Sequence, residues 1–376
     1  MKIAVIGGGI VGSTATFYLS QNPDIDLSLY DYGVGQASKA AAGIICPWFS
    51  QRRNKAWYRL ANAGAHFYPE MLQDLKAADQ PSQAYQGKET WLLKKKPSTR
   101  EDVYQIALSR RPEAPLIGDI EILTPAQQSA QLDEWTYDQD LVAIRQGAAI
   151  VDGQGLCEDL QAAATKNGMT SYQAKAQIDF QDDQILVITE DGQSQAFDQV
   201  ILATGAWLGD LLQPHGYQVD VRPQKGMLTV YDRDVSNWPL IMPEGEADII
   251  PHGQDTLYLG ATHENDKGFD LEPDMTSMAN IFDTIRTIIP AIDPEDYRDV
   301  KVGTRAYTSD YAPFYGPVPG HSNLYAASGL GSSGLTTGPI IGYQLAQACQ
   351  DKAQRLNPED YDPSPYLENI LRLARR

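Results

Sequence analysis

The sequence contains few cysteines and few histidines for its length of 376 residues. Cys46, Cys157 and Cys349 are odd in number and far apart, which excludes a disulfide framework and a cysteine metal cluster. His252 and His263 do not stand at metal-ligand spacing from another histidine or cysteine. The sequence therefore predicts no metal site and is typical of a reducing compartment.

Positive charge is also scarce, because 30 lysines and arginines face 49 acidic residues and the formal net charge is −19. Without a basic stripe to neutralise phosphates, the charge disfavours nucleic acid as a partner. No segment approaches the roughly 18 uninterrupted apolar residues of a membrane span, and glycines interrupt the apolar run near the N-terminus. We therefore expect a soluble, cytoplasmic protein, and its length predicts two domains.

The opening stretch is the most informative part of the chain. The run Lys2 to Ile6 is typical of a buried parallel strand, and a helical stretch that ends near Ser20 follows it. Between them, Gly7, Gly9 and Gly12 fit the pattern G-x-G-x-x-G. These glycines serve a tight turn, a close approach of backbone to a pyrophosphate, and close packing of strand on helix.

An acidic residue stands where a ribose partner is expected. A second apolar strand, Ile25 to Tyr30, ends at Asp31, whose carboxylate can accept a hydrogen bond from a ribose hydroxyl. Nineteen residues separate Gly12 from Asp31, close to the spacing of about 20 that this arrangement requires. An acid here disfavours a nicotinamide cofactor with a 2′-phosphate. The stretch therefore predicts a dinucleotide-binding unit.

The remaining chain divides between two kinds of pattern. Residues 80–145 carry turn signals without a βαβ rhythm, and residues 217–300 read as a mostly antiparallel sheet with a helix from Asn280 to Ile289. We predict an α/β fold of two domains: a Rossmann-like domain and a discontinuous second domain built on a mostly antiparallel sheet. The first domain comprises 1–79, 146–216 and 301–376, and the second comprises 80–145 and 217–300.

The stretch from 301 to 350 holds a second candidate site. Period-two alternation along a strand places Gly303, Arg305 and Tyr307 on one face. Further on, Gly329 to Leu335 forms a glycine-rich turn into a helix that continues to Gln350. The N-terminus of that helix can face a ligand carrying negative charge.

Four motifs in order resemble the D-amino-acid oxidase superfamily of FAD-dependent oxidoreductases, near glycine oxidase, sarcosine oxidase and the D-amino-acid dehydrogenases. They are the opening fingerprint with Asp31, Ala37-Ser38 to Ala42-Gly43, Ala203 to Trp207, and Arg305 through Leu335. The resemblance covers nearly the whole chain and is weakest from 80 to 145.

The resemblance implies an FAD site, and the FAD is expected to be non-covalent because Ala306 and Tyr307 offer no thiol where some relatives attach the flavin. Cys46 and Trp48 follow the flavin loop and are expected to border the pocket. The cofactor residues that it implies are Gly7, Gly9, Ile10, Val11, Gly12, Asp31, Tyr32, Ser38, Ala42, Gly43, Ile44, Ala176, Ala203, Thr204, Gly205, Trp207, Gly329, Leu330, Gly331, Ser332, Ser333, Gly334 and Leu335.

The substrate side is implied less completely. Arg305 matches the arginine that grips a substrate carboxylate in glycine oxidase-like members, a task that suits the guanidinium fork. Asp248 stands near a position where such relatives carry a tyrosine; it could pair with a substrate cation or be a loop acid. His263 could face the substrate or be a satisfied sheet histidine, and Ser332 replaces a basic residue of some relatives. Arg52 and its neighbour Arg53 we interpret as an exposed basic pair rather than an anion site.

The activity that the resemblance implies is oxidation of a small amino acid, such as glycine, sarcosine or a D-amino acid. The α-carbon hydrogen passes as hydride to the flavin, and the imine then hydrolyses to a keto acid, with no catalytic base assigned. The electron acceptor is oxygen or a quinone or other carrier. Two alternatives stay open: a dehydrogenase of a 2-hydroxy acid or polyol phosphate, and a non-catalytic flavoprotein.

Overall fold

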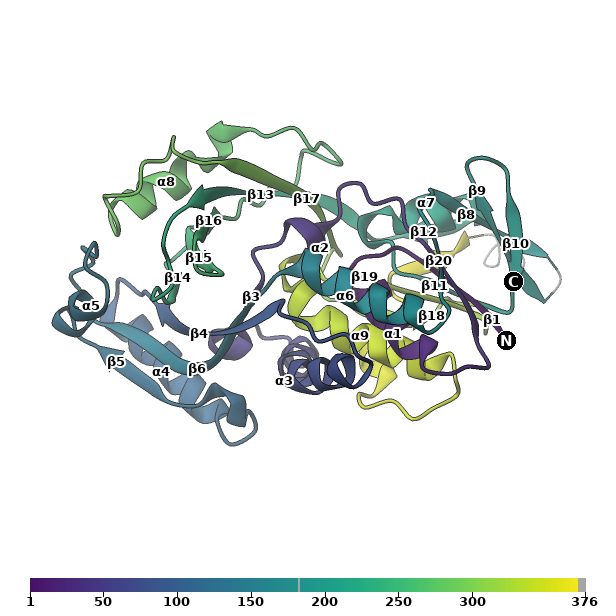
Figure 1. Ribbon diagram of the computed structural model, residues 1–376, viewed down its shortest axis with the longest axis horizontal. Coiled ribbons are helices and arrows are strands. Elements are labelled where there is room, and N and C mark those ends of the chain that lie inside the picture. Colours follow the sequence, from purple (N-terminus) through teal and green to yellow (C-terminus); the bar gives the residue numbers. More distant parts are fainter. Residues whose placement is uncertain (182, 371–376) are drawn as a thin grey trace.

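The computed structural model describes residues 1–181 and 183–370 and consists of two lobes, each built on a large sheet (Figure 1). The first lobe holds the N-terminus and the parallel strands, and the second holds the longer antiparallel strands. The predicted combination of a mostly parallel sheet with a mostly antiparallel one is confirmed, as is the α/β class.

The first lobe is organised around β1, the opening strand. Its sheet has six strands in the order β18-β19-β11-β1-β2-β7, all parallel to their neighbours except β18. Ile3 and Val5 enter one apolar cluster while Ala4 and Ile6 enter another, so β1 is buried on both faces. The strand bounds are β1 Lys2–Ile6, β2 Asp26–Tyr30, β7 Thr170–Tyr172, β11 Gln199–Leu202, β18 Phe314–Pro317 and β19 Leu324–Ser328.

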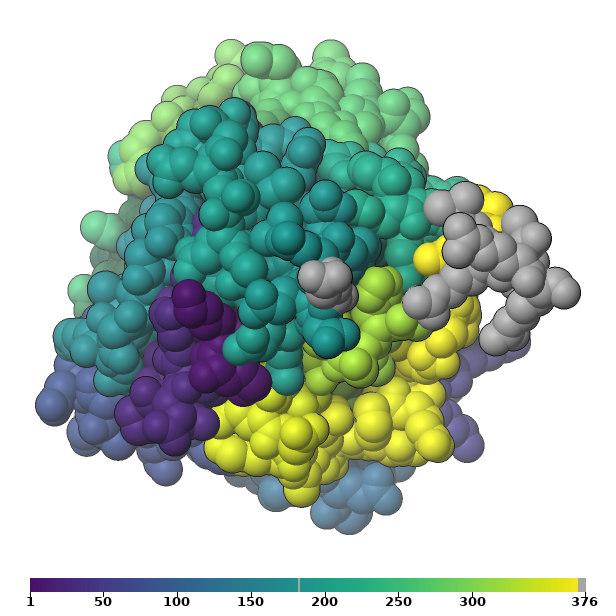
Figure 2. All heavy atoms as spheres, turned by 90° about the vertical axis from the view of Figure 1, so that its right-hand side faces the viewer, coloured from purple at the N-terminus to yellow at the C-terminus, as the bar shows by residue number. Residues whose placement is uncertain are grey.

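Helices α1, α3, α6 and α9 pack on one face of this sheet, and a small antiparallel sheet packs on the other together with α7. Figure 2 shows N-terminal, central and C-terminal segments meeting on one surface of the molecule, because all of them contribute to this lobe. The helices are α1 Ile10–Ser20, α2 Ala37–Ala40, α3 Lys55–Ala77, α6 Gly153–Lys166, α7 Leu208–Leu212 and α9 Gly334–Ala348. The small strands are β8 Ala176–Gln181, β9 Gln184–Thr189, β10 Ser194–Phe197, and the pair β12 Tyr217–Val219 and β20 Leu367–Asn369.

The second lobe is a nine-stranded sheet in the order β17-β13-β16-β15-β14-β4-β6-β3, with β5 paired to β6. Its pairs are antiparallel except β14 with β4. The strands are β3 Ile44–Ile45, β4 Tyr85–Leu92, β5 Ile120–Leu123, β6 Leu141–Val151, β13 Arg222–Asp232, β14 Leu240–Met242, β15 Asp248–His252, β16 Thr256–Gly260 and β17 Asp299–Tyr307. The helices of this lobe are α4 Pro97–Arg110, α5 Pro125–Gln131 and α8 Ala279–Arg286.

Strand β17 connects the two lobes. It pairs along its length with β13, and it also contacts the first lobe, where Thr304 bridges to Gln36. A Cβ at Gly303 would lie 2.8 Å from the Cβ of Ala40 in α2, so glycine permits this close approach. Strands β6 and β17 run through the predicted domain boundaries at 145/146 and 300/301; a division along the sheets would place both strands in the second lobe.

The helix ends differ modestly from the sequence predictions. Helix α8 ends at Arg286 rather than Ile289, and α9 ends at Ala348 rather than Gln350. No helix in the described ranges is long and apolar enough to cross a membrane; the cytoplasmic location stays a prediction.

Candidate active site

A cavity of about 410 Å³ lies at the carboxyl ends of the parallel strands. The turn between β1 and α1 forms one wall. Gly7 has a φ of 106°, and a Cβ there would lie 2.4 Å from the Ala203 carbonyl oxygen. A Cβ at Gly12 would lie 1.9 Å from the Gly7 carbonyl oxygen, so only glycine lets α1 begin this close to the strand.

Asp31 faces this cavity from the end of β2. Its carboxylate accepts a hydrogen bond of 3.0 Å from the Gly8 amide and bonds of 2.6 and 2.8 Å from the Gln36 amide group. These contacts orient the carboxylate beside the turn where a ribose would lie.

Three buried oxygens around the same cavity have no hydrogen-bond partner among the described residues. They are Gln36 Oε1, Thr204 Oγ1 and Thr304 Oγ1, and all three residues line the cavity. Buried polar atoms are normally satisfied, so such a cluster indicates a missing polar ligand. Together with the glycine turn and Asp31, it fits a nucleotide cofactor.

A second cavity of about 340 Å³ adjoins the first and shares Ala37, Ser38, Gly331 and Gly334 with it. Strand β17 contributes to both: Thr304 and Ala306 line the first cavity, while Gly303 and Arg305 line the second. The two faces predicted from the alternation therefore turn toward different cavities.

Arg305 is the central cation of the second cavity. Its Nη1 donates to the Thr262 carbonyl oxygen at 2.7 Å and to Gln224 Oε1 at 3.3 Å, while Nη2 and Nε have no partner in the described ranges. Burial lowers the pKa of the guanidinium to about 10, against the opposing effect of Glu246 and Glu264, so it stays charged at neutral pH. One edge of the fork is thus fixed and the other is available to a carboxylate.

Gly226 of β13 leaves space for the guanidinium of Arg305. A Cβ at this position would lie 2.6 Å from the Arg305 Cζ and 2.7 Å from both terminal nitrogens. Because the neighbouring strand lacks a side chain here, the guanidinium can lie flat against the sheet.

Acidic and neutral polar groups line other parts of the second cavity. Burial raises the pKa of Asp248 to about 7, and Lys94 partly opposes this shift. His263 Nδ1 lies 2.8 Å from Glu246 Oε1; burial, followed by the charge of Arg305, lowers the pKa of His263 despite Glu246. Burial raises the pKa of the Cys46 thiol to about 12, so this cysteine is unreactive at neutral pH.

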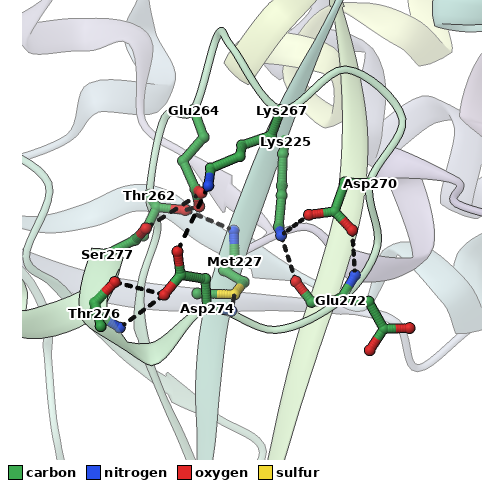
Figure 3. Close-up of polar contacts among 10 residues, drawn as sticks. All are labelled: Lys225, Met227, Thr262, Glu264, Lys267, Asp270, Glu272, Asp274, Thr276 and Ser277. Carbon is green, nitrogen blue, oxygen red and sulfur yellow. Dashed lines mark hydrogen bonds and ion pairs between the residues drawn. The ribbon is translucent and has the colours of Figure 1, made fainter.

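A buried lysine of β13 holds the loop that carries Asp270 and Glu272. Lys225 is 0% exposed; its Nζ lies 2.9 Å from Asp270 Oδ2 and also donates to the Glu272 carbonyl oxygen (Figure 3). The loop that carries these partners also places Phe269 against Trp207, which lines the first cavity, with ring centroids 5.0 Å apart. Lys225 therefore ties this loop to β13 near the cofactor cavity.

Residues 2–348 match the DAO family, described as FAD dependent oxidoreductase. The chain belongs to this family. The resemblance drawn from the motifs is confirmed, and FAD is the cofactor of the family. The unpartnered oxygens and the glycine turn of the first cavity fit this group.

Several proteins resemble the chain over nearly its whole length. YurR of Bacillus subtilis (strain 168), described as an uncharacterized oxidoreductase, is 33% identical over 96% of this chain and 98% of its own. The glycine oxidase of Pseudomonas putida KT2440 is 26% identical over 97% of both chains. Among solved structures, iminodiacetate oxidase from Chelativorans sp. BNC1 has a TM-score of 0.90 at 25% identity and covers 96% of this chain and 98% of that one.

Most of the residues implied by the family motifs line one of the two cavities. Those on the first are Gly7, Gly9, Ile10, Val11, Asp31, Tyr32, Ser38, Ala176, Ala203, Thr204, Gly205, Trp207, Leu330, Gly331 and Gly334. Those on the second are Ala42, Gly43, Ile44, Asp248, His263, Arg305, Ser332, Ser333 and Leu335, together with the shared Ser38, Gly331 and Gly334. Gly12 and Gly329 line neither.

Sequence reasoning missed some cavity residues and misplaced one. Trp48, expected beside the pocket, is fully buried and lines neither cavity; its Nε1 donates to the Gly147 carbonyl oxygen at 3.0 Å. Arg52 taken as a whole residue is exposed, as expected, but its guanidinium packs against Trp57 and lines the second cavity. The interpretation as a simple exposed basic pair misses this contact. Thr304, which lines the first cavity, could have been predicted because it alternates with Arg305 along the same strand. Glu246, which lines the second cavity, has no pattern around it in the sequence that would have identified it.

Proposed function

We propose that the protein oxidises the C–N bond of a small amino acid, using FAD bound non-covalently in the first cavity. The observation that carries the proposal is Arg305: a charged guanidinium with a free edge, in a cavity that adjoins the cofactor cavity. A carboxylate bound to it would lie close to the shared boundary of the two cavities.

The cofactor is proposed to lie along the residues that line the first cavity. The turn at Gly7 and Gly9 and the start of α1 would hold the pyrophosphate, and Asp31 would hold the adenosine ribose. The segment Gly331 to Gly334 at the start of α9 would approach the flavin, since it lines both cavities. Bound there, FAD would supply the acceptor for a hydride from the α-carbon of the substrate.

The chain's own residues orient the substrate. Arg305 binds the carboxylate, which restricts rotation and directs the α-carbon to the cofactor cavity. Asp248, on the same cavity, pairs with the substrate ammonium, and its raised pKa of about 7 suits it to take up the proton that must leave before oxidation. Met227, Met242 and Trp57 form apolar walls that limit water. The imine formed hydrolyses with water to a carbonyl product, and the acceptor that reoxidises the enzyme is oxygen or a carrier.

The comparisons support this class of substrate. Two of the similar proteins are described as a glycine oxidase and an iminodiacetate oxidase, and both names denote amino acids with a carboxylate next to a C–N bond. A glycerophosphate oxidase is also among the similar solved structures, but at 17% identity this likeness is one of fold alone and does not favour the polyol phosphate alternative.

The test is the absorption spectrum of the purified protein during anaerobic addition of glycine, sarcosine, D-alanine and D-proline. Bleaching of the flavin by one of them supports the proposal, and re-oxidation in air identifies an oxidase. Bleaching only by 2-hydroxy acids or glycerol phosphate refutes the amino-acid assignment. A yellow protein that no small substrate bleaches favours a non-catalytic flavoprotein.

A further inference from the structure

A second arginine lines the substrate cavity from a different side. Arg52 precedes α3, whereas Arg305 lies on β17 in the other lobe. The Arg52 Cζ lies 4.4 Å from the centre of the Trp57 ring, and Trp57 lines the same cavity and donates from Nε1 to Ser333 Oγ at 3.3 Å. The aromatic face thus holds the Arg52 guanidinium at the cavity rather than leaving it free in solvent.

Neither arginine has an ionic partner within residues 1–181 and 183–370, although the chain has many more acids than bases. No side-chain hydrogen bond of Arg52 to a described residue is formed either; only its backbone amide donates, to Ser50 Oγ. Burial lowers the pKa of Arg52, as expected for a guanidinium that loses water without gaining a carboxylate. Two unpaired guanidinium groups on one cavity call for a ligand with more than one negative charge.

We propose that the substrate carries two carboxylates, one bound by Arg305 and the other by Arg52. This inference rests on the proposed function and names its substrate class: an amino dicarboxylate, with the second carboxylate either on the nitrogen substituent or on the carbon side chain.

The charges of the cavity agree with this class. The two arginines contribute two positive charges, Glu246 contributes one negative charge, and Asp248 is partly charged near neutral pH. His263 is neutral there because its pKa is lowered, and it bonds to Glu246. A zwitterion with one carboxylate can compensate Arg305 but leaves Arg52 without an anionic partner, whereas an amino dicarboxylate with a protonated amine brings a second carboxylate that Arg52 can bind.

Binding can be separated from turnover with two ethers that cannot be oxidised at a C–N bond. Oxydiacetate carries two carboxylates and methoxyacetate carries one, with the same ether oxygen. Dissociation constants are measured on the FAD-loaded full chain from the change in flavin absorption. We expect oxydiacetate to bind at least about tenfold more tightly, the value of one charge-assisted contact, and Arg52→Gln to abolish most of that preference. Arg53→Gln, a neighbouring arginine that lines neither cavity, should retain the preference.

Anaerobic flavin reduction then locates the second carboxylate. Faster reduction by iminodiacetate than by sarcosine places it on the nitrogen substituent, and faster reduction by D-aspartate than by D-alanine places it on the carbon side chain. Equal binding of the two ethers by the wild type rules out a second carboxylate on the nitrogen substituent; if D-aspartate then also reduces the flavin no faster than D-alanine, the inference is overturned. A preference for the dicarboxylate that Arg52→Gln leaves unchanged overturns it as well. Reduction by sarcosine or D-alanine in that case leaves the proposed function intact. If none of these amino acids reduces the flavin, the proposed function itself fails.

Discussion

Replacing Gly226 with alanine moves Arg305 without removing it. The new Cβ would lie 2.6 Å from the Arg305 Cζ, whereas carbon atoms in contact prefer about 3.5–4.0 Å. The guanidinium must therefore retreat by about 1 Å. Because the clash is with the end of a long side chain and not with backbone, we expect the fold to survive.

This displacement of Arg305 should weaken its binding of the substrate carboxylate. One charge-assisted hydrogen bond is worth about 1.5–3 kcal/mol, and about 1.4 kcal/mol corresponds to a factor of ten. The KM for the amino acid, and the Kd of methoxyacetate, should therefore rise about 10- to 150-fold. The Tm should stay close to that of the wild type.

Steady-state kinetics and flavin-detected binding test this prediction. Gly87→Ala is the matched control, since it is also a glycine in a strand of the large sheet but its Cβ would meet nothing within 4 Å. The added methyl group could also obstruct the cavity directly, so the change is repeated in an Arg305→Lys background. If Gly226→Ala acts by displacing Arg305, it should raise the KM less in the Arg305→Lys background than in the wild type. A KM in Gly226→Ala equal to that of Gly87→Ala would refute carboxylate binding by Arg305.

Three further predictions follow from the same contacts. Burial raises the pKa of Asp248 to about 7, so the native protein holds this proton between about pH 4 and 7 while the unfolded chain releases it, and stability falls over that interval. The free energy of unfolding of Asp248→Asn, measured by thermal unfolding, should therefore increase relative to that of the wild type as pH rises from about 4 to 7, by up to about 4 kcal/mol. A difference between the two proteins that does not change with pH would contradict the raised pKa of Asp248. Gly12→Ala, whose Cβ would lie 1.9 Å from the Gly7 carbonyl oxygen, should weaken FAD retention by about tenfold or more in gel filtration, with Gly87→Ala unaffected. Lys225→Met should leave Tm nearly unchanged because methionine suits the buried site. Residues 264–274 should be cleaved faster in limited proteolysis, because the ion pair between Lys225 and Asp270 that holds this loop is lost. Equal cleavage rates in the variant and the wild type would argue against this role of Lys225.

The cofactor half of the site was predictable because its signals are local. Gly7, Gly12 and Asp31 act through a turn between adjacent elements, so their spacing along the chain reflects their spacing in the fold. The face of Arg305 was predictable as well, since side chains alternate along any strand. The domain boundaries remain a prediction, because a discontinuous sheet leaves no composition signal where β6 and β17 cross from one lobe to the other.

The substrate half depended on tertiary structure. Arg52, Asp248 and Arg305 come from the start of α3, from β15 and from β17, and they share one cavity only because the nine-stranded sheet places β17 beside the first lobe. An exposed arginine before a helix looks the same in sequence whether it faces solvent or a cavity. The sequence by itself determined the family, the cofactor and the face of β17 that carries Arg305, since these follow from contiguous motifs. Only the tertiary structure decided which distant charges line the second cavity, because that depends on how separate segments pack.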